Sequence, residues 1–332
     1  MSPEPRNDPD QWRPSANREA LTARAAMLWD IRGFFADRGV MEVETPIASR
    51  AAVSDPALDS LSTHWQGPGR PRGLKLYLQT SPEFAMKRLL AAGSGPIYQI
   101  CKVFRDGERG RLHHPEFSLL EWYQPGLGYW ELMAEVADLV RVVLGVPGLV
   151  AEHLSYGDLF RDRLGLDPWH TDIGALRLAA LELGIQGSTE LDLDLDGWLD
   201  LLLTHRLEAD LGQGAMTFVY DYPPSQAALA RMRSGPEPVG ERFELYLEGM
   251  ELANGFHELT DADEQRRRFL RDLGLRANAG RPTPPVDEDF LAALDAGLPP
   301  ASGVALGLDR LLMVKQGAEH IDQVLAFPVE RA

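Results

Sequence analysis

The sequence has a single cysteine, few basic residues for its length and no long apolar run. With Cys101 alone, no disulfide can form within the chain, which is typical of a reducing compartment. Acidic residues outnumber lysine and arginine by 50 to 33, and the formal net charge of −17 argues against a broad nucleic-acid-binding face. No apolar stretch approaches the ~20 residues of a membrane span, and none resembles a signal peptide. We therefore expect a cytoplasmic protein that makes no contact with a membrane.

Two common catalytic signatures are also missing. The sequence contains no glycine-rich loop that ends in Gly-Lys-Ser or Gly-Lys-Thr, so any ATP must be held by other groups. His257-Glu258 begins the pattern of zinc proteases, but Asp261 occupies the position of the second histidine. The sequence therefore predicts neither a Walker-type ATPase nor a zinc protease.

The N-terminal part of the chain predicts a tail followed by a helix. Residues 1–16 are polar and contain several prolines, which predicts a disordered tail. From Arg18 onwards apolar residues recur every three or four positions, as in an amphipathic helix, and Gly39 is expected to end it. Residues 40–44 then alternate like a short strand, which Pro46 closes.

Residues 97–104 and 116–123 predict two strands joined by a polar loop that is rich in arginine and histidine. Side chains alternate along a strand, so those of the second strand fall into two sets. One set is Phe117, Leu119, Glu121 and Tyr123. A carboxylate and a phenol among these residues would be unusual in a hydrophobic core. We therefore expect this face of the strand to be the floor of an active site.

The remaining elements predict a single α+β domain. Residues 150 to about 215 are leucine-rich with helical spacing, which predicts a helical insertion. Residues 243–248 alternate like a half-solvated antiparallel strand. Residues 303–307 predict a buried strand, with a helix from Leu308. Helices that flank a mainly antiparallel sheet give an α+β fold, in one catalytic domain over residues 17–332.

Three stretches follow the order of the three motifs of class II aminoacyl-tRNA synthetases, and each resembles its motif. They are residues 38–46, residues 104–123 with Phe104-Arg105 and Glu121-Trp122-Tyr123 at their ends, and residues 303–310. Residues 80–83 (Thr-Ser-Pro-Glu) and 251–258 are similar to the lysyl type of these enzymes. Over residues 17–332 the chain most resembles the elongation factor P lysine-lysyltransferases, which are stand-alone paralogues of lysyl-tRNA synthetase.

The resemblance implies an ATP site in which Arg105 and Arg310 are the catalytic residues. Arg105 would bind the α-phosphate and counter the charge that develops when the substrate carboxylate attacks. Phe117 would stack under adenine, and Arg310 would cover its other face or bind the γ-phosphate. Glu244 and Glu251 would hold Mg²⁺ against the phosphates. The implied ATP-binding residues are Arg105, Asp106, Gly107, Glu108, His113, His114, Phe117, Glu251, Leu252, Gly307 and Arg310.

The resemblance also implies a pocket for lysine. Glu83, Glu121 and Glu258 would face the ε-ammonium group, with Tyr123 hydrogen-bonding beside them and Asn254 orienting the substrate. Burying a carboxylate without a cation costs free energy. A neutral amino acid would not offset this cost, so we expect the pocket to reject it. The implied lysine-binding residues are Ser81, Pro82, Glu83, Glu121, Tyr123, Asn254, Glu258 and Ala305.

Two positions depart from the family pattern. The second motif usually has Arg, any residue and then a Glu that contacts the adenine amino group, but here Gly107 stands in the place of this Glu. Either Glu108 takes over through a shifted loop, or the backbone recognises adenine. Ala305 stands where lysyl-tRNA synthetases carry glycine, and its methyl group fits a substrate whose amino group sits differently, such as (R)-β-lysine.

The expected enzyme is a homodimeric, Mg²⁺- and ATP-dependent ligase. It would form a lysyl or β-lysyl adenylate and pass the acyl group to a lysine ε-amine of elongation factor P. Only about 17 residues precede the first-motif helix, so we expect no anticodon-binding domain and, given the acidic balance, no tRNA acceptor.

Two alternatives remain open. One is a truncated lysyl-tRNA synthetase that charges tRNA. The other is a non-catalytic paralogue that binds an amino acid as a sensor. Arg105, Glu251 and Arg310 argue against the sensor, because a sensor needs no groups that bind phosphate.

Overall fold

The computed structural model of the protein describes residues 10–332. Most of the predicted tail, residues 1–9, lies outside this range. The last residues of the predicted tail, Ser15 and Ala16, have backbone partners near the C-terminus. The backbone N–H of Ser15 donates to Ala326 (2.8 Å) and that of Ala16 donates to Leu325 (3.0 Å), and Ala16 is buried. These two bonds fix the chain before the first helix begins.

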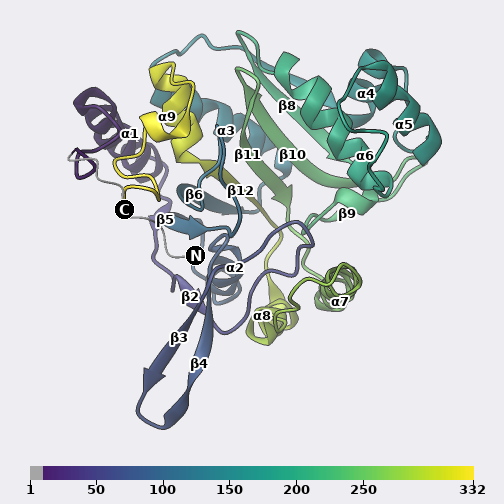
Figure 1. Cartoon of the computed structure of the whole chain (residues 1–332). Coiled ribbons are helices and arrows are strands. Elements are labelled where there is room, and N and C mark those ends of the chain that lie inside the picture. The colour runs from purple at the N-terminus through teal and green to yellow at the C-terminus, as the bar shows by residue number, and fades with distance from the viewer. Residues whose placement is uncertain (1–9) are drawn as a thin grey trace.

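A nine-stranded, mainly antiparallel sheet forms the centre of the described residues (Figure 1). In spatial order its strands are β1 (Met41–Glu42), β5 (Ile97–Phe104), β6 (Glu116–Pro125), β12 (Ala301–Gly307), β11 (Met250–His257), β10 (Val239–Leu247), β8 (Met216–Tyr222) and β7 (Ala151–Ser155), with β9 (Met232–Arg233) beside β10. Only the outer pairs β1–β5 and β7–β8 are parallel among the strands of this part of the chain. The predicted α+β class with a mainly antiparallel sheet is confirmed.

Three helices cover one face of this sheet: α1 (Arg18–Ala36), α3 (Tyr129–Leu144) and α9 (Leu308–Gln316). The side chain of Asn17 accepts a hydrogen bond from the N–H of Ala20 and so caps α1, as Asn commonly does. The helix ends near Gly39, as predicted, because Gly39 has a φ of +68° that favours glycine. Buried side chains of the three helices pack against Leu120 and Trp122 of β6.

Three more helices gather around the opposite face: α2 (Glu83–Ala91), α7 (Ala262–Asn278) and α8 (Glu288–Gly297). Met86, Phe269 and Phe290 of these helices form a second buried cluster together with Tyr123 of β6. Leu120 and Trp122 therefore point to the first face, and Tyr123 points to the second. The alternation predicted for residues 116–123 is confirmed.

The segment predicted to be a helical insertion contains several helices and lies at the far edge of the sheet (Figure 1). It contains α4 (Tyr156–Leu164), α5 (Ile173–Glu182), α6 (Leu195–Leu202) and the short helical turns η1 (Leu203–Leu207) and η2 (Glu208–Asp210). The segment does not begin with a helix, because its first residues form β7 and extend the sheet. Tyr156, Trp198 and Leu202 lie in its own apolar core, which also packs on Tyr222 and Tyr246 of the sheet.

A small second sheet stands apart from the body and includes a projecting hairpin (Figure 1). Its strands are β2 (Ala48–Ser49), β3 (Ser62–Gly67) and β4 (Arg70–Leu78), and two further turns are η3 (Pro224–Gln226) and η4 (Ile321–Gln323). Leu76 and Leu78, at the root of the hairpin, line the large cavity described below.

Candidate active site

A cavity of about 990 Å³ opens on the sheet face that carries α2, α7 and α8. Its floor is formed by β6, β12 and β11. From β6 it takes Phe117, Leu119, Glu121 and Tyr123, which are the four residues predicted to share one face. The floor of the cavity is therefore the surface that the alternation of the sequence indicated.

The pairing of the strands aligns the predicted lysine-binding residues in one row. Ala305 of β12 pairs with Glu121 on one side and with Asn254 of β11 on the other. Directly paired residues of neighbouring strands lie on the same face of a sheet. The three residues, distant in sequence, are thus side by side at the base of the cavity.

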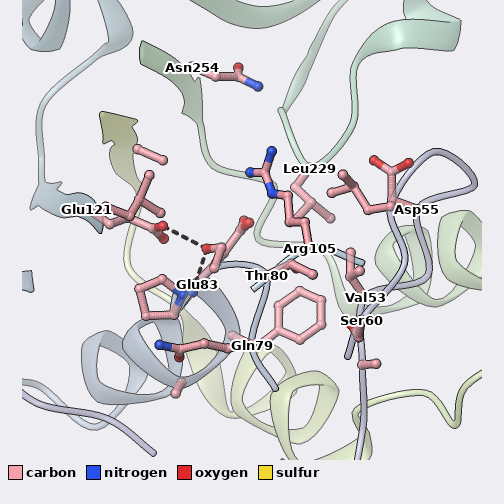
Figure 2. Close-up of a pocket in the computed structure, with 18 of the residues that line it drawn as sticks. Val53, Asp55, Ser60, Gln79, Thr80, Glu83, Arg105, Glu121, Leu229 and Asn254 are labelled. Carbon is pink, nitrogen blue, oxygen red and sulfur yellow. Dashed lines mark hydrogen bonds between the residues drawn. The ribbon is translucent and has the colours of Figure 1, made fainter. Parts of the chain in front are cut away.

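Glu121 is held by hydrogen bonds to both of its carboxylate oxygens. The hydroxyl of Ser81 donates to Oε2 (2.7 Å), and the hydroxyl of Tyr123 donates to Oε1 (2.6 Å). Figure 2 shows Glu121 and Glu83 close together in the cavity. Burial raises the pKa of Glu121 to about 7. Ser81 also accepts from the N–H of Glu83 (3.0 Å), where α2 begins just after Pro82.

Glu83 and Glu258 both form an ion pair with one lysine, which was not predicted as a site residue. Lys87 lies one helical turn after Glu83, and its Nζ is 2.5 Å from Glu83 Oε1 and 2.5 Å from Glu258 Oε2. The side chains of Lys87 and Glu258 are both 1% exposed. Burial raises the pKa of Glu258 to about 8. The spacing of Glu83 and Lys87 by four residues within a helix was the signal for this pair in the sequence.

Gly303 is a second residue that the sequence analysis missed. It pairs with Tyr123 across the floor. A Cβ atom at this position would lie 2.3 Å from the Tyr123 ring and 2.5 Å from Glu258 Oε1. Because glycine has no side chain, the Tyr123 ring and the Glu258 carboxylate can occupy these positions in the pocket.

Arg105 lies in the same cavity and has an unused donor. Its guanidinium carbon lies 5.0 Å from the centre of the Phe117 ring, and its Nη1 is 3.6 Å from Glu108 Oε1. The buried Nε has no hydrogen-bond partner among the described residues. Such a donor is costly unless a ligand satisfies it, and an anionic oxygen is the partner that a guanidinium binds best.

Arg310 is fixed from three sides at the N-terminal end of α9. It donates to the backbone oxygen of Glu251 (2.8 Å) and to the Glu251 carboxylate (3.3 Å), and its Nη2 lies 2.8 Å from His113 Nε2. Burial lowers the pKa of His113, with a further contribution from the positive charge of Arg310. A neutral His113 can accept this hydrogen bond. Leu252 and Gly307 line the cavity beside Arg310.

Three residues predicted to bind ATP differ from that prediction in their position or their contacts: Asp106, Gly107 and His114. Asp106 and Gly107 do not line the cavity, and Gly107 has a φ of +79°, which explains why glycine stands in this turn. Glu108 follows the turn and does line the cavity. His114 borders the cavity, but its ring bonds backbone groups of Glu116 and Val329 and so connects the loop to the C-terminal segment.

Glu244, a predicted metal ligand, also lies behind the wall of the cavity. It accepts hydrogen bonds from the hydroxyls of Tyr222 (2.7 Å) and Tyr246 (2.5 Å) and from Arg242. Arg242 lines the cavity, and its Nε also donates to Asn254 Oδ1 (3.2 Å). Arg242, which was not predicted as a site residue, connects Glu244 to Asn254, the residue expected to orient the substrate.

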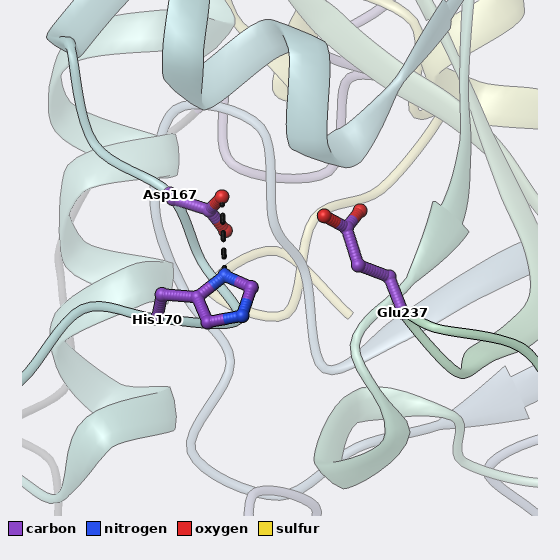
Figure 3. Close-up of side chains that lie close together, drawn as sticks. All are labelled: Asp167, His170 and Glu237. Atoms are coloured by element: carbon purple, nitrogen blue, oxygen red, sulfur yellow. Dashed lines mark ion pairs between the residues drawn. The ribbon is translucent and has the colours of Figure 1, made fainter.

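A separate group of possible metal ligands lies next to the helical insertion. Asp167, His170 and Glu237 have one ligand atom each within 4.8 Å of one another (Figure 3). Arg161 already satisfies the two carboxylates, with Nε 3.2 Å from Asp167 and Nη2 2.8 Å from Glu237. The cluster is explained without a metal ion.

Within residues 10–332, no helix is both long enough and apolar enough to cross a membrane. This observation agrees with the lack of long apolar runs in the sequence.

Comparisons with known proteins agree with the geometry. The family model of class II tRNA synthetases (D, K and N) matches residues 10–331. Proteins named elongation factor P--(R)-beta-lysine ligase from Enterobacter sp. (strain 638) and from Salmonella dublin are each 50% identical to this chain over 321 residues. The match covers 97% of this chain and 98% of each relative. The chain therefore belongs to the class II tRNA synthetase family of ATP-using ligases, in the group of the elongation factor P--(R)-beta-lysine ligases.

Proposed function

We propose that this enzyme activates lysine or (R)-β-lysine with ATP and transfers the acyl group to the ε-amine of one lysine on elongation factor P. One observation carries the proposal: a single cavity is lined both by the carboxylates of Glu83, Glu121 and Glu258 and by Arg105 and Arg310. Carboxylates suit a cationic amino acid, and arginines suit phosphates. The names of the relatives specify (R)-β-lysine and elongation factor P.

The reaction needs two transfers. In the first, a carboxylate oxygen of the amino acid attacks the α-phosphorus of ATP and pyrophosphate leaves. In the second, a lysine amine attacks the acyl carbon, AMP leaves, and the amine loses a proton. Arg105 would neutralise charge on the α-phosphate in the first transfer, and Arg310 would bind the adenine ring or the γ-phosphate. Holding both substrates in line would supply much of the remaining rate.

We infer that Glu251 is the protein ligand of a Mg²⁺ ion that accompanies ATP. Its carboxylate lines the cavity next to Arg310, and Mg²⁺ commonly binds one or two carboxylates plus phosphate oxygens. When bound, the ion would neutralise charge on the phosphates. Glu244 is surrounded by two tyrosines and Arg242, so we assign to it the positioning of Arg242 and not direct contact with the ion.

The pocket floor supports (R)-β-lysine as the preferred substrate. Ala305 lies between Glu121 and Asn254, where its methyl group takes space near the substrate backbone. An amino group moved by one carbon, as in β-lysine, is the change that such a methyl group would favour. Replacing Ala305 by glycine tests this inference through the ratio of kcat/KM for the two isomers.

We further propose a homodimer that uses α1 and the edge strand β1. Trp29 on α1 is 78% exposed, and Met41 on β1 is also exposed. Among the described residues β1 pairs only with β5, which leaves its other edge open. A second copy related by a two-fold axis would cover both features. Sedimentation analysis should give twice the chain mass of 36.8 kDa.

The decisive experiment measures the product on the protein acceptor. Purified elongation factor P is incubated with enzyme, ATP, Mg²⁺ and either lysine or (R)-β-lysine, and its intact mass is determined. We expect the mass of one lysyl-type group at a single lysine and essentially uncharged lysine tRNA in a parallel assay. Efficient tRNA charging without the mass shift would assign a truncated synthetase. Binding without pyrophosphate exchange would assign a sensor.

Glu108→Ala should raise the KM for ATP about tenfold and reduce the preference for ATP over GTP, because the adenine amino group would lose a charged acceptor. Glu108 is the acidic residue after the Gly107 turn that lines the cavity near Arg105. Pyrophosphate exchange with each nucleotide measures the effect. Glu108→Gln keeps an acceptor oxygen and serves as the matched control. An unchanged nucleotide preference in the alanine variant would assign adenine recognition to the backbone.

A further inference from the structure

Lys87 is a buried cation with no part in the two transfers described above. Its side chain is 1% exposed, and Nζ also lies 5.9 Å from the centre of the Phe290 ring. Placing an ammonium group in such surroundings is costly unless carboxylates surround it. Burial acts to lower the pKa of Lys87, but Glu258 and Glu83 outweigh this effect and raise the pKa above its usual value. Lys87 is therefore charged throughout the physiological pH range.

The two partners of Lys87 come from different walls of the pocket. Glu83 begins α2 and is partly exposed to the cavity, whereas Glu258 follows the end of β11 and is buried. Glu258 Oε1 has no hydrogen-bond partner among the described residues. The other titratable groups that face this cluster are Glu121 and Tyr123 of β6. Among the described residues, Lys87 is thus the cation that pairs with Glu83 and Glu258, and Glu121 and Tyr123 are the acidic neighbours of this group.

The charges of this group match those of a diamino acid. Glu83, Glu121 and Glu258 supply three negative charges when ionised, and Lys87 supplies one positive charge. Lysine and β-lysine each carry two ammonium groups, and these remain after the carboxylate has become an adenylate. We propose that Lys87 is an internal counter-ion that joins Glu83 to Glu258 and sets the pocket charge for a substrate with two ammonium groups. This role, which rests on the proposed function, makes Lys87 a positioning and specificity-determining residue.

Removing the positive charge of Lys87 should raise the pKa of Glu258. Without Lys87, Glu258 would hold a proton up to a higher pH, because its nearest cation would be gone and Glu83 and Glu121 would still repel its charged form. A substrate ammonium binds the ionised carboxylate, so binding would have to remove this proton. The affinity for a diamino acid should then fall at neutral pH and recover as the pH rises.

The test compares Lys87→Met with the wild-type enzyme by calorimetry from pH 6 to 9, with lysine, (R)-β-lysine and ATP as ligands. Methionine keeps the length of the side chain and removes its charge. We expect about tenfold weaker diamino acid binding at pH 7, since one pKa unit corresponds to a tenfold change. Most of this loss should be recovered by pH 9. The variant should release more protons than the wild-type enzyme when it binds a diamino acid. Its affinity for ATP should be nearly unchanged.

Two matched variants separate this role from simple packing. In a Glu258→Gln background, Lys87→Met should no longer move the pH profile, because the titrating group is gone. Glu83→Gln should move the wild-type profile to lower pH, since Lys87 would then pair with Glu258 alone. This variant leaves the buried ion pair intact, so it tests the proposal even if Lys87→Met fails to fold.

Different results would contradict the counter-ion role of Lys87 and the proposed function. If Lys87→Met weakens binding by the same factor at every pH, or if Glu83→Gln leaves the profile in place, Lys87 has no counter-ion role. A wild-type enzyme that binds neither diamino acid would instead contradict the proposed function itself.

Discussion

Replacing Arg105 or Arg310 by alanine should lower the rate of pyrophosphate exchange by about 10²–10³-fold, the usual effect of losing one oriented donor to a developing negative charge. Arg105 brings an unsatisfied Nε into the cavity, and Arg310 is held there by Glu251 and His113. The effect should fall mainly on kcat, because the charge grows between bound ATP and the transition state.

A nearby arginine provides the control for this experiment. Arg109 pairs with Glu330 and Asp322 and does not line the cavity. Such partly exposed ion pairs contribute only about 0–1 kcal/mol, so Arg109→Ala should keep near-normal exchange. Near-normal exchange in Arg105→Ala or Arg310→Ala would remove that arginine from the catalytic assignment.

The second large effect is expected when a methyl group is added at position 303. Gly303→Ala should weaken the binding of lysine and β-lysine by about 5–150-fold, corresponding to the ~1–3 kcal/mol typical of overpacking. The new Cβ would displace the Tyr123 ring and the Glu258 carboxylate, and through Tyr123 it would disturb Glu121. The proposed ATP-binding residues Arg105 and Arg310 have no atom among those nearest to this Cβ, so the affinity for ATP should change little.

Calorimetry with each ligand measures this difference. Gly274→Ala in α7 is the matched control, because a Cβ there meets no atom within 4 Å. It should leave all affinities unchanged. If Gly303→Ala bound the diamino acids normally, the assigned position of the ammonium groups beside Tyr123 and Glu258 would be wrong.

The parts of the site that lie on one strand were predictable from the sequence. The alternation from Phe117 to Tyr123 is a local property, since neighbouring side chains of a strand must point to opposite faces. It placed Glu121 and Tyr123 in the cavity correctly. Ser81 and Pro82, which directly precede α2, were implied by the resemblance of residues 80–83 to the lysyl type.

Contacts between distant segments were not predictable in the same way. The family resemblance implied that Glu244 is a metal ligand, and the strand pattern gave no sign that its carboxylate has protein partners. In the structure Tyr222, from the neighbouring strand β8, covers it. The need for glycine at position 303 likewise depends on where Tyr123 and Glu258 meet in space. The ion pair of Lys87 with Glu258 likewise joins residues 171 positions apart, so no local pattern could predict it.

The central strand β12 shows how the cavity obtains its volume. Gly303, Ala305 and Gly307 of this strand line the cavity together with Val304, while the side chains of Val304 and Leu306 belong to the core. The small side chains at positions 303, 305 and 307 therefore leave space on the floor of the cavity. One or two methyl groups added to or removed from this strand can retune the substrate without disturbing the apolar residues behind it. A family with this construction can change amino acid specificity while its fold and its nucleotide chemistry stay the same.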